Sequence, residues 1–217
     1  MTGRAFLFGS ARLRASPEPE GPTLSIAEPL RHAKVQELVR RLDAAMAPAD
    51  DAGRCRAVKT VLCELIQPGA DFLDASFLQP APGRYARRLL HRDPEGRYTA
   101  IVMVWDRDQG TPLHDHAGIW CVECVYQGGI RVTSFNAMGG DPERDIVQFQ
   151  QEQVVHAGPG EAGALIPPFE YHVLENAKEI PAVTLHIYGG EMTHCHVFEQ
   201  VEGGWLRKYR ELSYTPA

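Results

Sequence analysis

Two histidines stand one residue apart in "TPLHDHAGIWC", residues 111–121. If this stretch is a strand, His114 and His116 point to one face and Asp115 points to the other. Each buried imidazole needs a partner, which backbone groups or water can supply. A His-x-His pair on the inside of a barrel is also a natural pair of metal ligands. The pair alone leaves both explanations open.

A third histidine shifts the balance toward a metal. "PPFEYHVLEN" places His172 on another expected strand, with Asn176 four residues later. Three imidazoles from neighbouring strands would give an ion three ligands and leave positions open for other molecules.

The elements that must position these side chains follow from the pattern of apolar residues. Between residues 26 and 66, apolar side chains recur at helical spacing in two stretches, which predicts two amphipathic helices. After residue 80 the chain becomes a series of short β-rich runs separated by Gly, Pro and Asn. Many short strands without helices between them indicate a β-sandwich or a small barrel.

Length and composition fit one globular domain with a helical appendage. We expect a flexible tail at 1–25, a helical segment at 26–80 that packs on the barrel, and the barrel at 81–217. The 217 residues carry a formal net charge of −6, which argues against a nucleic-acid surface. No apolar run reaches the roughly 20 residues of a membrane-spanning helix. Five irregularly spaced cysteines fit a reducing cytoplasm, so we expect a cytoplasmic protein, either monomeric or a small homo-oligomer.

Five motifs together resemble the thiol dioxygenases of the cupin superfamily, and cysteine dioxygenase most of all. They are "RYARRLL", "HDHAGIWC", "YHVLEN", "TLHIY" and "THCHVFEQ", in order and in spacing, from about Arg84 to Gln200. The resemblance implies a mainly β, cupin-type double-sheet jelly-roll barrel with N-terminal α-helices. It also implies one Fe(II) ion held by His114, His116 and His172, with a small thiol oxidised by O2 to a sulfinic acid.

The same resemblance implies residues for the substrate carboxylate. Tyr85 and Arg87 match the family's Tyr-x-Arg, whose arginine pairs with the carboxylate of the thiol. A guanidinium suits this task because it binds a carboxylate through two charge-assisted hydrogen bonds. Most arginines are solvated, and Arg84 and Arg88 compete for the role.

Thr184, His186 and Tyr188 alternate in "VTLHIY" and therefore share one strand face. The family has Ser-x-His-x-Tyr there, a hydrogen-bonded relay that ends at a phenol beside the iron. Threonine keeps the hydroxyl of serine, so we expect the relay to persist. The resemblance implies that His186 orients Tyr188 and does not bind the metal.

Cys121 occupies the position where most cupins have a ligand glutamate. In animal-type cysteine dioxygenases the matching cysteine forms a thioether with the tyrosine that matches Tyr188, so the resemblance implies the same bond here. An offset of five residues from His116 would turn Cys121 outward unless the chain contains one irregular step. Gly118 is a plausible place for that step.

Other readings of the neighbouring residues stay open. Cys121 and Cys124 have Cys-x2-Cys spacing, but they lie in a strand-like run without a second pair, so zinc is not expected. We expect His194 and His196 to lie outside the metal ligands, either as structural residues or as residues that contact those ligands. Glu123 is a rival metal ligand if its strand carries a bulge.

We expect an Fe(II)-dependent dioxygenase that oxidises L-cysteine, with no nucleic-acid or membrane partner. The alternative within the same chemistry is 3-mercaptopropionate or another small mercapto acid, although relatives that prefer 3-mercaptopropionate have glutamine where this chain has Arg87. A cupin isomerase would need a carboxylate ligand such as Glu123. A non-catalytic sugar- or effector-binding cupin would not need the Thr-His-Tyr series.

Overall fold

The computed structural model describes residues 33–168 and 170–216. The expected flexible tail at 1–25, and the beginning of the expected helical segment, lie outside these residues.

Two helices follow each other along the chain, as the apolar spacing predicts. They are α1 (Ala33–Ala45) and α2 (Asp51–Leu65). Helix α1 buries one stripe that includes Leu38 and Leu42, both with no exposed surface. Helix α2 begins after Asp50, whose carboxylate accepts a hydrogen bond from the backbone N–H of Gly53 at 2.8 Å and so satisfies an otherwise unpaired N–H group of the first turn.

A five-stranded antiparallel sheet forms one wall of the barrel. Its order is β1-β2-β9-β4-β7. The strands are β1 (Ala86–Arg92), β2 (Thr99–Trp105), β9 (Ala182–Tyr188), β4 (Cys121–Gln127) and β7 (Ala162–Leu165).

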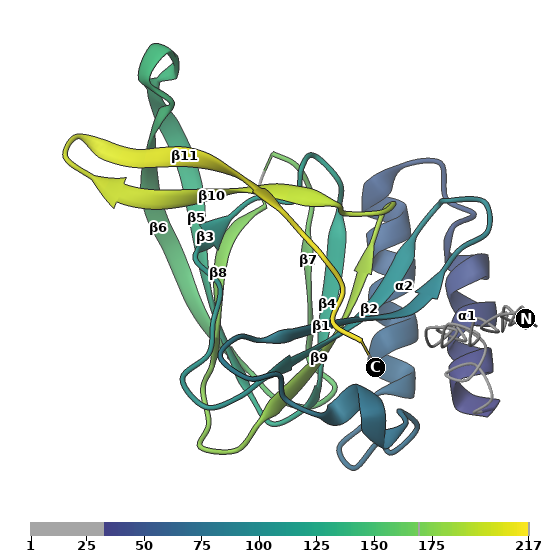
Figure 1. Ribbon diagram of the computed structural model, residues 1–217. Helices are drawn as coiled ribbons and strands as arrows, with labels where there is room; N and C mark the ends of the chain where they lie inside the picture. Colours follow the sequence, from purple (N-terminus) through teal and green to yellow (C-terminus); the bar gives the residue numbers. More distant parts are fainter. Residues whose placement is uncertain (1–32, 169, 217) are drawn as a thin grey trace, which may run out of the picture.

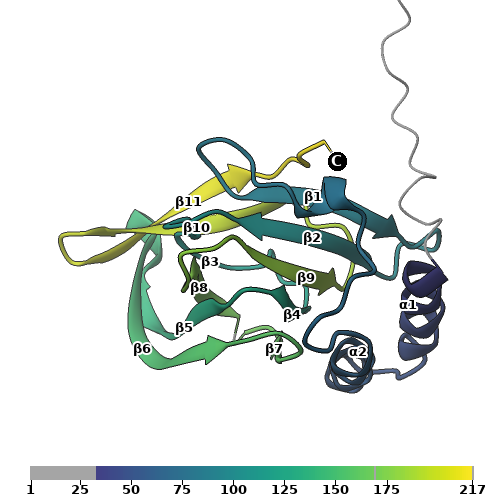
Figure 2. The same cartoon turned by 90° about the horizontal axis from the view of Figure 1, so that it is seen from below.

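The remaining six strands pair in a closed ring in the order β10-β11-β6-β5-β8-β3. Figures 1 and 2 show this group facing the five-stranded sheet, with the β5–β6 and β10–β11 hairpins extending beyond the barrel. The mainly β, two-sheet prediction is confirmed. The strands are β3 (Leu113–His114), β5 (Ile130–Asp141), β6 (Ile146–Ala157), β8 (Tyr171–Asn176), β10 (His194–Val201) and β11 (Gly204–Glu211).

The five-stranded sheet has two buried faces, which is why β2 and β9 contain only buried residues. Its outer face packs against the helices (Figure 2), through side chains such as Val122 and Leu185. Its inner face turns Met103, Cys121 and Tyr188 toward the barrel interior. Strand alternation therefore separates a helix-packing face from a site-facing face.

The β1–β2 turn depends on one buried carboxylate. Asp93 is 2% exposed and accepts hydrogen bonds from the Arg97 backbone N–H at 2.9 Å and from Arg97 Nε at 2.8 Å. The side-chain hydrogen bond from Arg97 is the main reason that the pKa of Asp93 falls to about 2.

We expect Asp93→Asn to lower the free energy of unfolding by about 1–3 kcal/mol at pH 7, because a charge-assisted hydrogen bond to a buried carboxylate is lost. Since the folded-state pKa is depressed, the contribution is complete above the ordinary value of 3.8 and disappears as pH falls through about 2. Denaturant unfolding at pH 7 and at a pH of about 2 measures the contribution of Asp93. Glu95→Gln, in the same turn but exposed, is the control and should have little effect. Equal stability of Asp93→Asn and the parent protein at pH 7 would contradict the assignment.

Candidate active site

Three histidines converge inside the barrel. His114 on β3 is the register partner of His172 on β8, and their ring centroids lie 4.7 Å apart. The centroid of His116 is 5.3 Å from that of His114 and 5.0 Å from that of His172. One nitrogen from each ring lies within 4.8 Å of the others. The expectation that His114 and His116 share one strand is wrong. Strand β3 ends at His114, and His116 lies in the following loop.

The environment of the three rings suits neutral ligands. His172 has no exposed surface, His116 is 1% exposed and His114 is 9% exposed. Burial lowers the pKa of all three below the ordinary histidine value, because a charged imidazolium is costly in this setting. They are therefore neutral at pH 7, as a metal ion requires of imidazole ligands.

Hydrogen bonding distinguishes the two explanations of the histidines. Nδ1 of His114 lies 3.1 Å from the carbonyl oxygen of Pro112. In contrast, Nδ1 of His116 and both ring nitrogens of His172 are buried and have no hydrogen-bond partner among the described residues. Backbone groups thus account for one imidazole only. A metal ion would take one nitrogen from each ring, so the arrangement fits a metal.

The residue between the paired histidines stabilises the loop from the other side. Asp115 accepts hydrogen bonds from the backbone N–H groups of His196 and Ala117, at 2.8 and 3.1 Å. Its second oxygen lies 2.8 Å from Nδ1 of His196. His194 stacks on Tyr209. Neither His194 nor His196 belongs to the three-histidine cluster, in agreement with a structural role.

Cys121 and Tyr188 are direct cross-strand partners on β4 and β9. Both side chains are buried on the inner face of the sheet. The irregular step expected before Cys121 is present, since Ala117 and Gly118 have φ values of 53° and 78°. Burial raises the pKa of the Cys121 thiol and of the Tyr188 phenol well above their usual values.

The other candidate metal ligands, Cys121, Cys124 and Glu123, do not belong to the three-histidine cluster. Cys124 packs in the helix-facing cluster and Cys121 in the inner one, so the Cys-x2-Cys pair does not converge. Glu123 points inward, in a part of β4 that pairs with β9 in regular register. It lies outside the three-histidine cluster, with its Oε1 3.8 Å from Nδ1 of His172. Burial raises the pKa of Glu123 to about 8.

The Thr184–His186–Tyr188 series shares the inner face of β9, but only part of the expected relay is hydrogen-bonded. Trp105 Nε1 donates to Thr184 Oγ1 at 2.9 Å, and that oxygen lies 2.8 Å from Nε2 of His186. The rings of His186 and Tyr188 are stacked, with centroids 6.0 Å apart and an interplanar angle of 14°. No hydrogen bond joins the Tyr188 phenol to His186 among the described residues, and Nδ1 of His186 lies 3.9 Å from the sulfur of Cys121.

The three histidines share a small cavity of about 20 Å³ with Tyr85, Arg87 and Tyr188. That volume holds little more than one water molecule, so a larger ligand requires the lining side chains to move. Arg87 is 5% exposed; it donates to the carbonyl oxygen of Met192 at 2.8 Å and lies 4.7 Å above the Tyr214 ring.

Of the three candidate arginines, the structure brings only Arg87 into this cavity. Arg88 is equally buried but donates to the carbonyl oxygens of Pro216 and Phe77. Arg84 is exposed and lines an outer pocket of about 350 Å³, which shares Arg87 and Arg210 with the inner cavity.

Part of the cavity wall was missed by sequence reasoning. It comes from β10, β11 and the flanking segments, through Met192, Cys195, Arg210 and Leu212. The local sequence gives little signal for them, because β11 is largely exposed and polar and carries no motif of its own.

The sequence of this chain matches the model of a known protein family. The family model described as cysteine dioxygenase type I matches residues 74–201, more than half of the chain. The chain belongs to this family. The matched range contains all three histidines, Arg87, Cys121 and Tyr188.

Curated cysteine dioxygenases are similar over the same region. The chain is 27% identical to cysteine dioxygenase type 1 of Homo sapiens over 121 residues, which cover 55% of this chain and 58% of the human one. The Danio rerio protein of the same name is 25% identical over 126 residues, with the same coverage. The chain thus spans somewhat more than half the length of the cysteine dioxygenases that it matches.

Solved structures give weaker matches. A cupin 2 conserved barrel domain protein from Rhodopseudomonas palustris has a TM-score of 0.41 and 15% identity, covering 58% of this chain and 75% of that one. A protein from Thermus thermophilus has a TM-score of 0.41 and 18% identity, covering 52% of this chain and 90% of that one. Separately, none of the helices in the described residues is long and apolar enough to span a membrane.

Proposed function

We propose that this protein is an Fe(II)-dependent thiol dioxygenase that oxidises L-cysteine with O2 to cysteine sulfinic acid. One observation carries the proposal: three buried, neutral imidazoles converge without sufficient protein partners, in a chain of the cysteine dioxygenase type I family. Arg87 lines the same cavity and can bind the carboxylate of an amino-acid thiol.

His114, His116 and His172 would hold the iron. Three neutral imidazoles contribute no charge, so the full positive charge of the ion remains available to stabilise a thiolate. Bound Fe(II) would supply the redox chemistry and the open positions that thiol oxidation by O2 needs. Both oxygen atoms of O2 end on the substrate sulfur, and the thiol becomes a sulfinic acid without another reductant.

The protein's own groups would bind and orient the substrate. The Arg87 guanidinium pairs with the carboxylate, which fixes one end of the molecule relative to the histidines. The Tyr188 phenol lines the cavity and stays protonated, because burial raises its pKa. It can therefore donate a hydrogen bond to a bound group. Thr184 and Trp105 hold His186 in place through the hydrogen bonds described above.

Oxygen uptake by the purified protein loaded with Fe(II) tests this proposal. We expect uptake to require both iron and a thiol, and the sulfinic acid to accumulate in a one-to-one ratio with the O2 consumed. L-cysteine, 3-mercaptopropionate and cysteamine are the substrates to compare. Absence of thiol-dependent uptake would rule the proposal out and favour an isomerase or a binding protein of the same fold.

The second candidate is a dioxygenase for 3-mercaptopropionate or another small mercapto acid. Arg87 can pair with the carboxylate of any of these thiols. The ratio of kcat/KM values for L-cysteine and 3-mercaptopropionate decides between the two, and we expect it to exceed one.

We also expect a thioether bond between Cys121 and Tyr188 to form during aerobic turnover, because the two side chains face each other across β4 and β9. The bond would join the sulfur to a carbon of the phenol ring, with the thiol hydrogen and one ring hydrogen lost and O2 as the oxidant that takes up the two electrons and two protons. Peptide mass mapping after turnover should show a linked pair of peptides that is two hydrogens lighter than their sum. Cys124, on the opposite face of β4, is the internal control and should stay unlinked. If only separate Cys121 and Tyr188 peptides are found after exhaustive turnover, Cys121 merely fills space.

A further inference from the structure

We propose that Glu123 is a positioning residue that orients the imidazoles of His172 and His186 through hydrogen bonds to their Nδ1 atoms. The proposal rests on the proposed function in one respect, since it takes His172 as a metal ligand. Glu123 itself is not a ligand in this assignment.

The geometry places Glu123 between the two imidazoles. It is the cross-strand partner of His186, on β4 and β9. Its Oε2 lies 3.6 Å from Nδ1 of His186, and its Oε1 lies 3.8 Å from Nδ1 of His172. One carboxyl group thus faces both a candidate metal ligand and the histidine that Thr184 holds.

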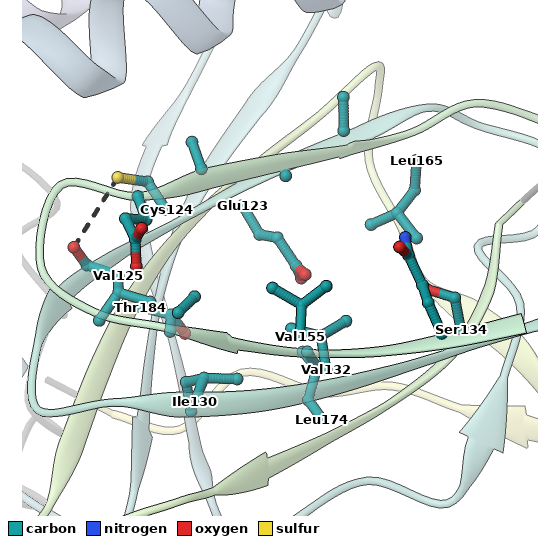
Figure 3. A pocket seen from close by; sticks show the side chains of 16 residues that line it. Glu123, Cys124, Val125, Ile130, Val132, Ser134, Val155, Leu165, Leu174 and Thr184 are labelled. Carbon is teal, nitrogen blue, oxygen red and sulfur yellow. Dashed lines mark hydrogen bonds between the residues drawn. The ribbon is translucent and has the colours of Figure 1, made fainter.

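No hydrogen bond to the Glu123 side chain from any other residue is present among the described residues. Figure 3 shows its side chain extending from β4 into a cavity, with Val132, Val155 and Leu174 beyond it. This cavity has a volume of about 280 Å³, and its described lining includes neither Arg87 nor the three histidines. Glu123 is 8% exposed, and its Oε2 has no hydrogen-bond partner in the described part of the chain.

A buried carboxyl group without a partner is costly, so its retention needs a compensating interaction. The Nδ1 atoms of His172 and His186, at 3.8 and 3.6 Å, are positioned to supply it. The present separations exceed a hydrogen bond by less than about 1 Å, and the contact is expected to tighten when a metal fixes the imidazoles.

A hydrogen bond from Nδ1–H of His172 to Glu123 would leave the Nε2 lone pair for the metal. Carboxyl groups behind metal-binding histidines commonly fix the ring and its tautomer in this way. Glu123 would therefore set the orientation of His172, and through His186 it would connect this ligand to the hydrogen bonds of β9.

The test compares Glu123→Leu with Glu123→Gln. Leucine removes the acceptor and suits the apolar cavity, so the variant should unfold at the same temperature as the parent protein or higher. Its affinity for Co(II) should nevertheless fall roughly ten- to hundredfold. Glutamine keeps an acceptor oxygen at the same position, so Glu123→Gln should retain Co(II) affinity within about threefold of the parent value.

Chelator competition with Co(II) alone gives these affinities without turnover, and the visible absorption of bound Co(II) reports the ligand geometry. Glu161→Leu is the matched control, because Glu161 lines the same cavity, is exposed and accepts a hydrogen bond from the Gly158 backbone. It should bind Co(II) normally and give the parent spectrum.

Parent affinity and an unchanged Co(II) spectrum in Glu123→Leu would overturn the proposal. An equal loss in Glu123→Leu and Glu161→Leu would overturn it as well, because the effect would then belong to the cavity in general. Failure of the parent protein itself to bind Co(II) would instead contradict the assignment of the three histidines as metal ligands, and with it the proposed function.

Discussion

Replacing His172 with alanine is expected to abolish both metal binding and thiol oxidation. His172 has no exposed surface, and neither of its ring nitrogens has a hydrogen-bond partner among the described residues, so a ligand role is the task that the structure leaves for this side chain. Two remaining imidazoles make a poor site. Loss of a residue that hydrogen-bonds a metal ligand typically lowers metal affinity roughly ten- to hundredfold. Loss of a ligand itself should lower the affinity for Co(II) or Fe(II) by more than that.

Metal content after reconstitution and desalting measures the loss, with thermal unfolding to show that the variant is folded. His194→Ala is the matched control, since His194 stacks on Tyr209 outside the cluster and should leave metal content unchanged. Full occupancy in His172→Ala would show that the three-histidine assignment is wrong.

Replacing Arg87 with alanine is expected to reduce kcat/KM for L-cysteine roughly tenfold or more, because a buried charge-assisted pair with the carboxylate contributes about 1.5–3 kcal/mol. Cysteamine has no carboxylate, so its kcat/KM should change far less. The loss for L-cysteine should fall mainly on KM.

The adjacent arginine provides a close control. Arg88 is as buried as Arg87 but donates to backbone carbonyl groups away from the cavity. Arg88→Ala should therefore lower the stability of the protein without changing the ratio of the kcat/KM values for L-cysteine and cysteamine. Equal losses for L-cysteine and cysteamine in Arg87→Ala would move the carboxylate partner elsewhere, with Arg210, which lines both the inner cavity and the outer pocket, as the next candidate.

The sequence predicted the elements whose patterns are strong. A continuous apolar run marked β2 because both faces of its sheet are covered, and helical spacing marked α1 and α2. The three-histidine cluster could be predicted because its members lie in motifs that resemble a known family, whose model matches residues 74–201. The strand alternation that places Cys121 opposite Tyr188 could also be predicted, once Gly118 was allowed an irregular step.

Features that depend on tertiary pairing could not be predicted. Strand β3 has two residues and is defined only by its neighbours β8 and β10. Strand β11 is mostly exposed, so it has little apolar pattern, although its pairing with β10 brings Arg210 to the cavity. The parallel stacking of His186 and Tyr188 depends on side-chain rotation, which residue spacing does not determine.

The two-faced character of β4 and β9 has a consequence for how this chain can change during evolution. Val122 and Leu185 face the helices, whereas Cys121, Thr184 and Tyr188 face the site. A substitution alters one side chain on one face. A single-residue insertion or deletion inside either strand exchanges the faces beyond it, so that site residues would turn toward the helices and core residues toward the cavity. A point substitution in these strands therefore disturbs one face, whereas a change in length disturbs both, so we expect their length to be held far more strictly than that of the outer tip of the β5–β6 hairpin.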